Sequence, residues 1–318
     1  MQLFYHLGLF IAGLLILVAG AEALIRGAVN LARLLGVSPF IIGLTLVGFG
    51  TSAPELVVNV SAALYDAPGL AMGNIVGSNI ANIGLILGVA AVLSPLVTQA
   101  RMLTREMPIM VAVSVLIWIL VSDGQLSRID AGILLAGFAI TTWYYFRIGQ
   151  EEPEAIQEEL SELAPRKPSR WGNGILAVLG LMSLIGGAHL MVESATEIAR
   201  LWQVPEVIIG LTIVAVGTSL PELASTVAAA YRKQADIAVG NVVGSNLFNI
   251  LMILGVTGMV KPLDVDASLL RVDLPVMLGF AVAMFLMLLR TATIYRLEGI
   301  VLLLAYAGFI GWQAVQAS

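Results

Sequence analysis

Two glutamates occupy equivalent places in a pair of nearly identical segments. Glu55 ends the sequence GTSAPE, and Glu222 ends the sequence GTSLPE, 167 residues further along the chain. Each glutamate follows a threonine and a serine, and Thr51 lies four residues before Glu55. This spacing places both side chains on one face of a helix. Carboxylate, hydroxyl and carbonyl oxygens are the ligands that hard cations such as Na⁺ and Ca²⁺ prefer.

The sequence around these segments is that of an integral membrane protein. Hydrophobic residues make up 59% of the 318 positions and charged residues only 12%, and the mean hydropathy is +0.96. Apolar stretches of about 20 residues recur, each long enough to cross roughly 30 Å of hydrocarbon. A carboxylate at the middle of a bilayer costs at least a few kcal/mol, so Glu55 and Glu222 indicate function. The absence of cysteine excludes disulfides and thiolate metal sites.

A proline inside each segment predicts a break in the helix that carries it. Pro54 lacks an N–H, and its ring clashes with the carbonyl group of Gly50, as Pro221 does with that of Gly217. A freed carbonyl group costs several kcal/mol in the interior of a bilayer when it has no partner. A bound cation could satisfy these carbonyl oxygens.

A second motif adds a stripe of oxygen-bearing side chains. The sequences GNIVGSNIAN, from Gly73, and GNVVGSNLFN, from Gly240, place polar residues at intervals of four, on one face of a helix. The stripe consists of Asn74, Ser78 and Asn82 in the first motif and of Asn241, Ser245 and Asn249 in the second.

Both motifs belong to a long internal repeat. With the offset of 167 residues, about 29 of the 53 positions from Val37 to Val89 are identical without a gap, which indicates duplication. Five helices are predicted in each half, and an odd number inverts the second half relative to the first. Inverted repeats are typical of secondary transporters, whose substrate sites lie near the middle of the membrane between the repeats.

The sequence therefore predicts an all-α membrane protein with ten transmembrane helices in two inverted five-helix repeats. The first repeat is expected at 1–148, an acidic linker at 149–171 and the second repeat at 172–318. The helices are expected at 3–25, 39–64, 70–93, 106–122, 129–147, 173–192, 205–230, 236–260, 273–290 and 296–315.

Basic residues predict the orientation of these helices. One set of loops and helix ends holds 12 of the 16 Lys and Arg residues and the other set holds 4, and the richer side should be cytoplasmic. Both termini are then extracytoplasmic, and the linker is cytoplasmic. Glu22 and Arg26, four residues apart near the end of the first helix, are expected to form an ion pair.

The paired motifs, GTSAPE and GTSLPE with GNxVGSN after each, resemble the Ca²⁺/cation antiporter superfamily, and most of all the prokaryotic sodium/calcium exchangers. The resemblance covers nearly the whole chain. It implies a secondary active antiporter that exchanges Ca²⁺ for Na⁺ by alternating access, in the plasma (inner) membrane. It implies no enzymatic activity, no cofactor and no nucleic-acid or protein partner; the partners are the two ions and the lipid bilayer.

The resemblance also implies which residues bind the ions. The first and sixth helices, with residues 3–34 and 173–202, would slide across the others as gates. Many sodium/calcium exchangers carry Asp at the position of Asn249, which leaves the number of coupled Na⁺ ions and the coupling ion itself open. The implied ligands are the carboxylates of Glu55 and Glu222, the hydroxyls of Thr51, Ser52, Ser78, Thr218, Ser219 and Ser245, the amide of Asn82, its counterpart Asn249, and backbone carbonyls near Gly48 and Ala215.

Other functions remain open from the residues alone. Glu55 and Glu222 could each carry a proton, and H⁺ or K⁺ could then drive export of Ca²⁺ or another divalent cation. A cation channel would need a continuous pore. An intramembrane hydrolase would need a nucleophile with a base or a metal with His or Asp ligands, and both histidines, His6 and His189, lie outside the repeated motifs.

Overall fold

The protein is all-α apart from four strands of two residues each. The structure, a computed structural model, describes residues 2–35, 39–65, 68–98, 105–150, 169–202 and 215–317. Helical elements lie in all ten predicted ranges, although residues 205–214 of the seventh range fall outside the described residues. Among the described residues, six helices are long and apolar enough to cross a membrane. The predicted all-α membrane fold is therefore confirmed.

In the first half, the helix breaks and π-helical turns lie in the second and third segments. The elements are α1 (Gln2–Leu35), α2 (Pro39–Ile42), η1 (Gly43–Val47), α3 (Gly48–Thr51), α4 (Ala53–Leu64), α5 (Pro68–Ala81), η2 (Asn82–Leu87), α6 (Gly88–Leu93), α8 (Glu106–Leu120) and α9 (Arg128–Gln150), where η denotes a π-helix.

The second half repeats this order within the described residues. Its elements are α11 (Arg170–Leu201), α13 (Ala215–Thr218), α14 (Leu220–Tyr231), α15 (Ala235–Leu247), η4 (Phe248–Ile253), α16 (Leu254–Val260), η5 (Leu269–Asp273), α17 (Leu274–Thr291) and α18 (Arg296–Ala317).

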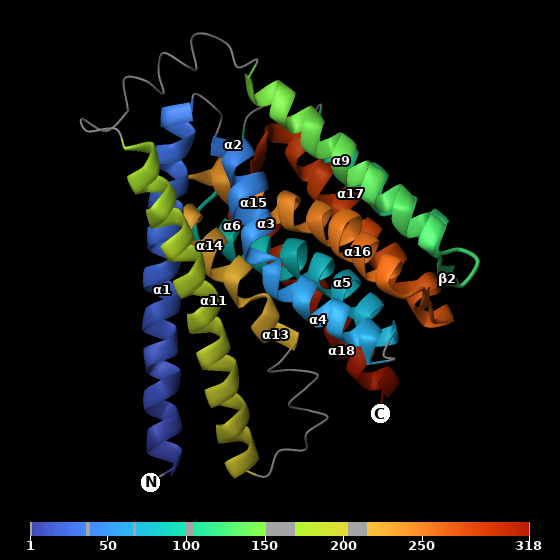
Figure 1. Cartoon of the computed structure of the whole chain (residues 1–318), viewed down its shortest axis with the longest axis horizontal. Coiled ribbons are helices and arrows are strands. Elements are labelled where there is room, and N and C mark those ends of the chain that lie inside the picture. Colours follow the sequence, from blue (N-terminus) through green and yellow to red (C-terminus); the bar gives the residue numbers. More distant parts are fainter. Residues whose placement is uncertain are drawn as a thin grey trace.

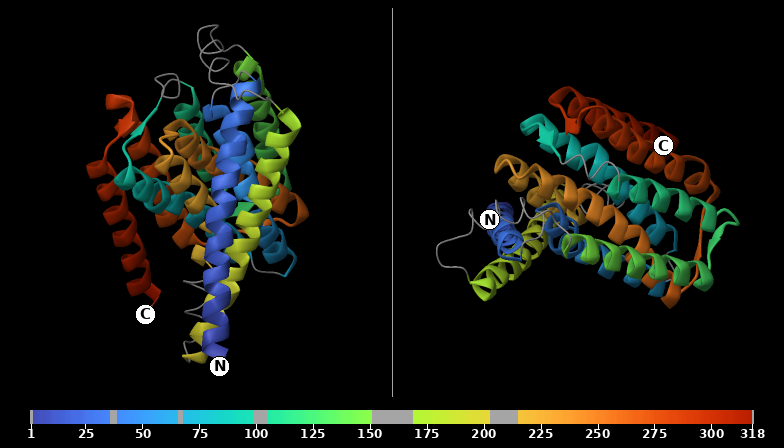
Figure 2. Two further views of the ribbon diagram at one scale, coloured as in Figure 1. Left: turned by 90° about the vertical axis from the view of Figure 1, so that its left-hand side faces the viewer. Right: turned by 90° about the horizontal axis from the view of Figure 1, so that it is seen from above.

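The two halves are inverted relative to each other. The equivalent helices α1 and α11 lie side by side and run in opposite directions along one flank of the molecule (Figures 1 and 2). The described ends near both termini lie at one end of the molecule, whereas the end of α9 and the start of α11 lie at the other (Figure 1). This is the arrangement that five helices per repeat require.

Short antiparallel strands join the halves at two places. Strand β1 (Leu96–Val97) pairs with β4 (Thr293–Ile294), and β2 (Gln125–Leu126) pairs with β3 (Leu263–Asp264). The offset of 167 residues carries β1 onto β3, so the two ribbons are related by the repeat. Elements of two residues carry no periodic pattern, and the sequence analysis did not predict them.

Close packing between α1 and α11 depends on glycines spaced by seven residues. A Cβ atom at Gly20 would lie 2.5 Å from the backbone nitrogen of Leu184, and one at Gly187 would lie 2.5 Å from that of Leu17. Gly13 similarly faces the carbonyl oxygen of Gly187. Small residues allow the backbones of membrane helices to approach closely in this way. The two long helices therefore form one packed pair.

Helix α15 lies at the centre of the other helices. All residues from Ile237 to Leu247 are buried, including the polar ones. A side chain at Gly244 would overlap the backbone of Leu44 in η1, so the second motif of one half packs against the first motif of the other. This crossing brings the polar segments of both repeats together.

Candidate functional site

Both predicted helix breaks are present, each at a serine. Helix α3 ends at Thr51 and α4 begins at Ala53, with Ser52 between them at φ −83° and ψ 8°. Ser219 separates α13 from α14 with φ −90° and ψ 4°. Pro54 and Pro221 lie in the first turn of the new helix, where a missing N–H is tolerated.

The two breaks meet inside the protein, where both glutamates are buried. Glu55 and Glu222 each retain 1% of their accessible surface, and the charge of Glu222 acts on Glu55. Ser52 Oγ in the first repeat donates a hydrogen bond of 3.0 Å to Glu222 Oε1 in the second. A carboxylate of one repeat is thus held by a hydroxyl of the other.

Asparagine 241 fixes the helix that carries Glu222. Its Nδ2 donates to the carbonyl oxygen of Glu222 at 3.3 Å, to Ser225 Oγ at 3.0 Å and to Thr226 Oγ1 at 2.7 Å. Its Oδ1 accepts from Thr51 Oγ1 at 3.3 Å. A single buried amide therefore connects α14 and α15 with the break in the other repeat.

The carbonyl group of Gly48 is satisfied by protein donors in this structure. It accepts from Ser245 Oγ at 3.1 Å, from Thr51 Oγ1 at 3.3 Å and from the backbone nitrogen of Ser52 at 3.3 Å. A cation at this oxygen would compete with the two hydroxyl groups, which can rotate away and offer their own oxygens.

Four asparagines cross between the repeats where the third segments become π-helical. Asn82 begins η2, and Asn249 is the second residue of η4. Asn82 Nδ2 donates to Asn246 Oδ1 at 2.9 Å, and Asn249 Nδ2 donates to Asn79 Oδ1 at 3.0 Å. A π-helical turn inside an α-helix frequently marks a functional site.

Four buried oxygens at this centre have no hydrogen-bond partner. They are Glu55 Oε2, Glu222 Oε2, Asn82 Oδ1 and Asn249 Oδ1, which form two pairs related by the repeat. A buried acceptor without a donor costs about 1–3 kcal/mol, and more if it is charged. Among the described residues no group of three or more His, Cys, Asp or Glu comes together, so two carboxylates act with neutral oxygens here.

The other predicted site residues lie on the same elements. Ser78 is buried in α5, Ser219 is buried at its break and Thr218 is half-buried at the end of α13. Ala215 is the first residue of α13, and its side chain lies outside the described residues. The stripe of Ser78 and Asn82 in one repeat and of Ser245 and Asn249 in the other is thus buried in both halves.

Sequence reasoning did not select several polar residues of this centre. Asn79 and Asn246 end the GSN triplet of each repeat, one position away from the stripe of intervals of four. Their identity across the offset of 167 residues was the available signal. Ser225 and Thr226 have no polar repetition of this kind at Val58 and Asn59 as a pair, so only the structure indicates their contact with Asn241.

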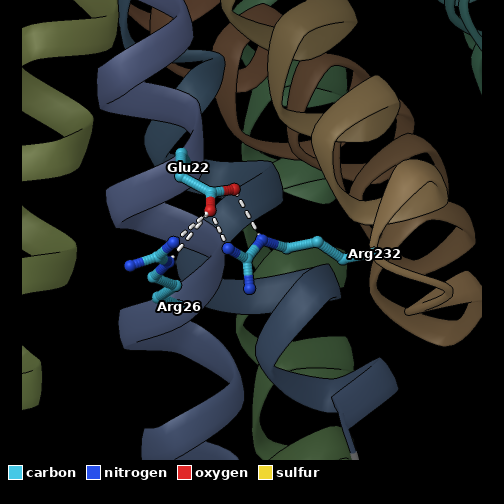
Figure 3. Close-up of polar contacts among 3 residues, drawn as sticks. All are labelled: Glu22, Arg26 and Arg232. Atoms are coloured by element: carbon cyan, nitrogen blue, oxygen red, sulfur yellow. Dashed lines mark hydrogen bonds and ion pairs between the residues drawn. The ribbon is translucent and has the colours of Figure 1, made fainter.

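An ion-pair cluster outside the buried centre ties α1 to the rest of the molecule. Glu22 pairs with Arg26 at 2.7 Å, as predicted, and also with Arg232 at the end of α14 (Figure 3). The second partner was not predicted, because it lies 210 residues away in the sequence. These side chains are partly exposed, and exposed ion pairs contribute about 0–1 kcal/mol to stability.

Inverted repeats whose helix breaks meet at a buried pair of carboxylates define a secondary transporter. The chain belongs to the sodium/calcium exchanger family: the family model described as "Sodium/calcium exchanger protein" matches residues 5–147 and 173–315. The resemblance to the Ca²⁺/cation antiporters is therefore confirmed.

Known proteins are similar to the chain over nearly its whole length. It is 37% identical to the inner membrane protein YrbG of Escherichia coli over 314 residues, which cover 96% of this chain and 95% of YrbG. It is 36% identical to the sodium/calcium exchanger MaX1 of Methanosarcina acetivorans, covering 95% and 96% of the two chains. A solved structure of the sodium-calcium exchanger NCX_Mj matches with a TM-score of 0.87 and 31% identity, covering 97% of this chain and 99% of that one.

Proposed function

We propose that this protein exchanges Ca²⁺ for Na⁺ across the membrane by alternating access, with the ions bound between the two repeats. The observation that supports this most directly is the set of four buried oxygens without hydrogen-bond partners, two from carboxylates and two from amides. All four are acceptors, and a cation is the ligand that satisfies several acceptors at once. The protein acts as a transporter and not as an enzyme, and it needs no cofactor.

The charge of the two glutamates gives a physical basis for exchange. With both ionised, Glu55 and Glu222 supply a charge of −2, which one Ca²⁺ or two Na⁺ neutralise. Unit charges a few Å apart interact strongly in a medium of low dielectric constant. Ca²⁺ and Na⁺ therefore compete for the same carboxylates, and a third Na⁺ is disfavoured but not forbidden. We expect two or three Na⁺ to be exchanged for each Ca²⁺.

Neutral oxygens complete the proposed coordination. Calcium takes six to eight oxygen ligands, so two carboxylates alone do not suffice. The proposed neutral ligands are the hydroxyls of Thr51, Ser52, Ser78, Thr218, Ser219 and Ser245, the amides of Asn82 and Asn249, and the backbone carbonyls near Gly48 and Ala215.

The packed pair of α1 and α11 is the proposed moving element. Both helices exceed 30 residues, more than the roughly 20 needed to cross a bilayer. They contact the remainder through the helices that carry the breaks, including α14. Sliding of this pair across α4 and α14 would open the ion site to one side of the membrane and then to the other.

The proposed topology places both termini outside the cytoplasm and the linker inside, in the inner membrane. The excess of Lys and Arg on one side supports it, and the relative YrbG is described as an inner membrane protein. The proposed repeats are 1–148 and 172–318, with the linker at 149–171 between them.

The decisive experiment is a flux assay on the full chain in proteoliposomes. Saturable ⁴⁵Ca²⁺ uptake driven by an outward Na⁺ gradient supports the proposal, with choline replacing Na⁺ as the control. Uptake driven only by a proton or a K⁺ gradient would assign the protein to a different coupling ion. Unitary currents in planar bilayers without counter-ion dependence would indicate a channel.

A further inference from the structure

The central asparagines raise a question of direction that the ligand set alone does not answer. The amide group of asparagine has an oxygen end, which binds cations, and an NH₂ end of similar size, which repels them. Rotation of the amide by half a turn exchanges the two ends. Asn82 and Asn249 can serve as cation ligands only if their surroundings distinguish the oxygen from the nitrogen.

We propose that Asn79 and Asn246 are positioning residues that hold Asn249 and Asn82 with their amide oxygens towards the bound cation. This inference rests on the proposed ion-binding function and adds two residues that do not themselves touch the ion. Each positioning residue acts across the boundary between the repeats: Asn79 on Asn249, and Asn246 on Asn82.

The hydrogen bonds of the network have one allowed direction. Asn249 Nδ2 donates to Asn79 Oδ1 at 3.0 Å, and Asn82 Nδ2 donates to Asn246 Oδ1 at 2.9 Å. If either ligand amide turned around, its oxygen would face another oxygen and its NH₂ group would face the ion. The observed direction leaves Asn82 Oδ1 and Asn249 Oδ1 as buried acceptors without a donor.

Backbone carbonyl groups fix the positioning residues in turn. Asn246 Nδ2 lies 3.4 Å from the carbonyl oxygen of Asn79, and Asn79 Nδ2 lies 3.5 Å from that of Asn246. A carbonyl oxygen can only accept, so the NH₂ end of each positioning amide must face it. Although these bonds are long, reversing either amide would set oxygen against oxygen.

Burial makes this direction costly to lose. Asn79, Asn82, Asn246 and Asn249 are each exposed by no more than 3%. Bulk water therefore does not replace a lost partner, and a buried polar group without its partner costs about 1–3 kcal/mol. The direction set by the two backbone carbonyls is thereby transmitted to the ligand oxygens.

A double-mutant cycle tests this role, because aspartate has oxygen at both ends and needs no orienting partner. In the wild-type background, Asn79→Ala should raise the half-saturating Na⁺ and Ca²⁺ concentrations about tenfold, the equivalent of about one buried hydrogen bond. In the Asn249→Asp background, the same substitution should leave these concentrations unchanged or lower them, because it removes an oxygen that faces the new carboxylate.

The repeat provides an independent second cycle with Asn246→Ala and Asn82→Asp, which keeps the test valid if one variant folds poorly. Ser114→Ala is the control, since Ser114 is buried and bonds only to the carbonyl oxygen of Met110 in its own helix among the printed contacts. Both cycles are measured by equilibrium ⁴⁵Ca²⁺ binding to the purified chain and by flux in proteoliposomes.

Opposite or unequal effects in the two backgrounds support the positioning role. Equal losses in both backgrounds, with exchange by the wild type intact, overturn the positioning role alone and leave the proposed function standing. A wild type that neither binds nor exchanges Ca²⁺ overturns the proposed function, and the positioning role with it.

Discussion

Glu55 and Glu222 are the residues on which the proposed chemistry depends most. Each is buried within a helix that restarts after a break, and each has one carboxylate oxygen without a hydrogen-bond partner. The hydroxyl of Ser52 reaches Glu222 from the opposite repeat. Two carboxylates surrounded by neutral oxygens can neutralise one divalent or two monovalent cations, which is the charge relation that exchange requires.

Removing either charge should abolish exchange. Glu55→Gln and Glu222→Gln each leave a single carboxylate, so a bound Ca²⁺ would keep a net positive charge in the protein interior. An unbalanced buried charge costs about 3 kcal/mol or more, and Ca²⁺ affinity should fall more than about a hundredfold. Equilibrium ⁴⁵Ca²⁺ binding measures the change.

The matched control for these variants is Glu193→Gln, which neutralises an exposed glutamate of α11. Its Ca²⁺ binding should equal that of the wild type. Full Ca²⁺ flux in both Glu55→Gln and Glu222→Gln would rule out the proposed site.

A third carboxylate should change the response to Na⁺ and to pH before it changes Ca²⁺ binding. Asn249→Asp adds a negative charge beside the buried pair and a group that can take up a proton. The apparent Na⁺ affinity should therefore rise, and Na⁺-driven Ca²⁺ uptake should become more dependent on pH. Uptake curves between about pH 6 and 9 for wild type and variant test this; superimposed curves would place Asn249 away from the ions.

At the scale of elements, the structure divides into a packed pair of long helices and a core that carries the breaks. Glycines set the distance between α1 and α11, and Glu22 and Arg232 connect α1 with the end of α14 (Figure 3). Because this connection is partly exposed and weak, it does not prevent movement of the pair. The helix pair is therefore joined tightly within itself and loosely to part of the core.

Adjacent glycines of α11 should respond differently to a single methyl group. At Gly187 a Cβ atom would lie 2.5 Å from Leu17 N and 2.8 Å from Gly13 O, whereas at Gly186 it would meet no atom within 4 Å. Gly187→Ala should thus separate the two helices, destabilise the protein by about 1–3 kcal/mol and reduce flux.

Gly186→Ala is the matched control and should leave both properties unchanged. Thermal unfolding in detergent and flux in proteoliposomes compare the two variants. Equal melting temperatures would mean that α1 and α11 are not held together by this close contact.

At the scale of the whole molecule, inversion is visible in the opposite directions of α1 and α11 and in the two strand ribbons that link the halves (Figure 1). Each ribbon takes one strand from each repeat. The same relation pairs Asn79 with Asn249 and Asn246 with Asn82 at the centre. One pseudo-symmetry therefore arranges both the periphery and the proposed ion site.

Labelling should find the linker and the C-terminus on opposite sides of the membrane. The chain has no cysteine, so Leu160→Cys and Ser318→Cys each introduce a unique thiol. A membrane-impermeant maleimide applied to intact cells should label the thiol at position 318 and not the one at 160. Permeabilised cells provide the positive control, and labelling of both from outside would contradict the topology.

The sequence by itself determined the class of fold, the inverted repeat and most of the site. Hydropathy identifies the spans because burial of apolar helices in lipid is a local property of composition. Glu55 and Glu222 could be identified because a carboxylate within an apolar segment is costly wherever the chain places it. The breaks at Ser52 and Ser219 were equally predictable, since Pro54 and Pro221 act within one turn of helix.

Only the tertiary structure decided which residues of one repeat contact the other. Ser52 with Glu222, Asn79 with Asn249 and Glu22 with Arg232 are pairs separated by at least 170 residues, and no local spacing encodes them. The π-helical turns at Asn82 and near Asn249 were also missed, because one added residue per turn leaves no mark in an apolar sequence. These contacts depend on how closely the inverted halves pack, and packing distance is a property of the folded pair rather than of either segment.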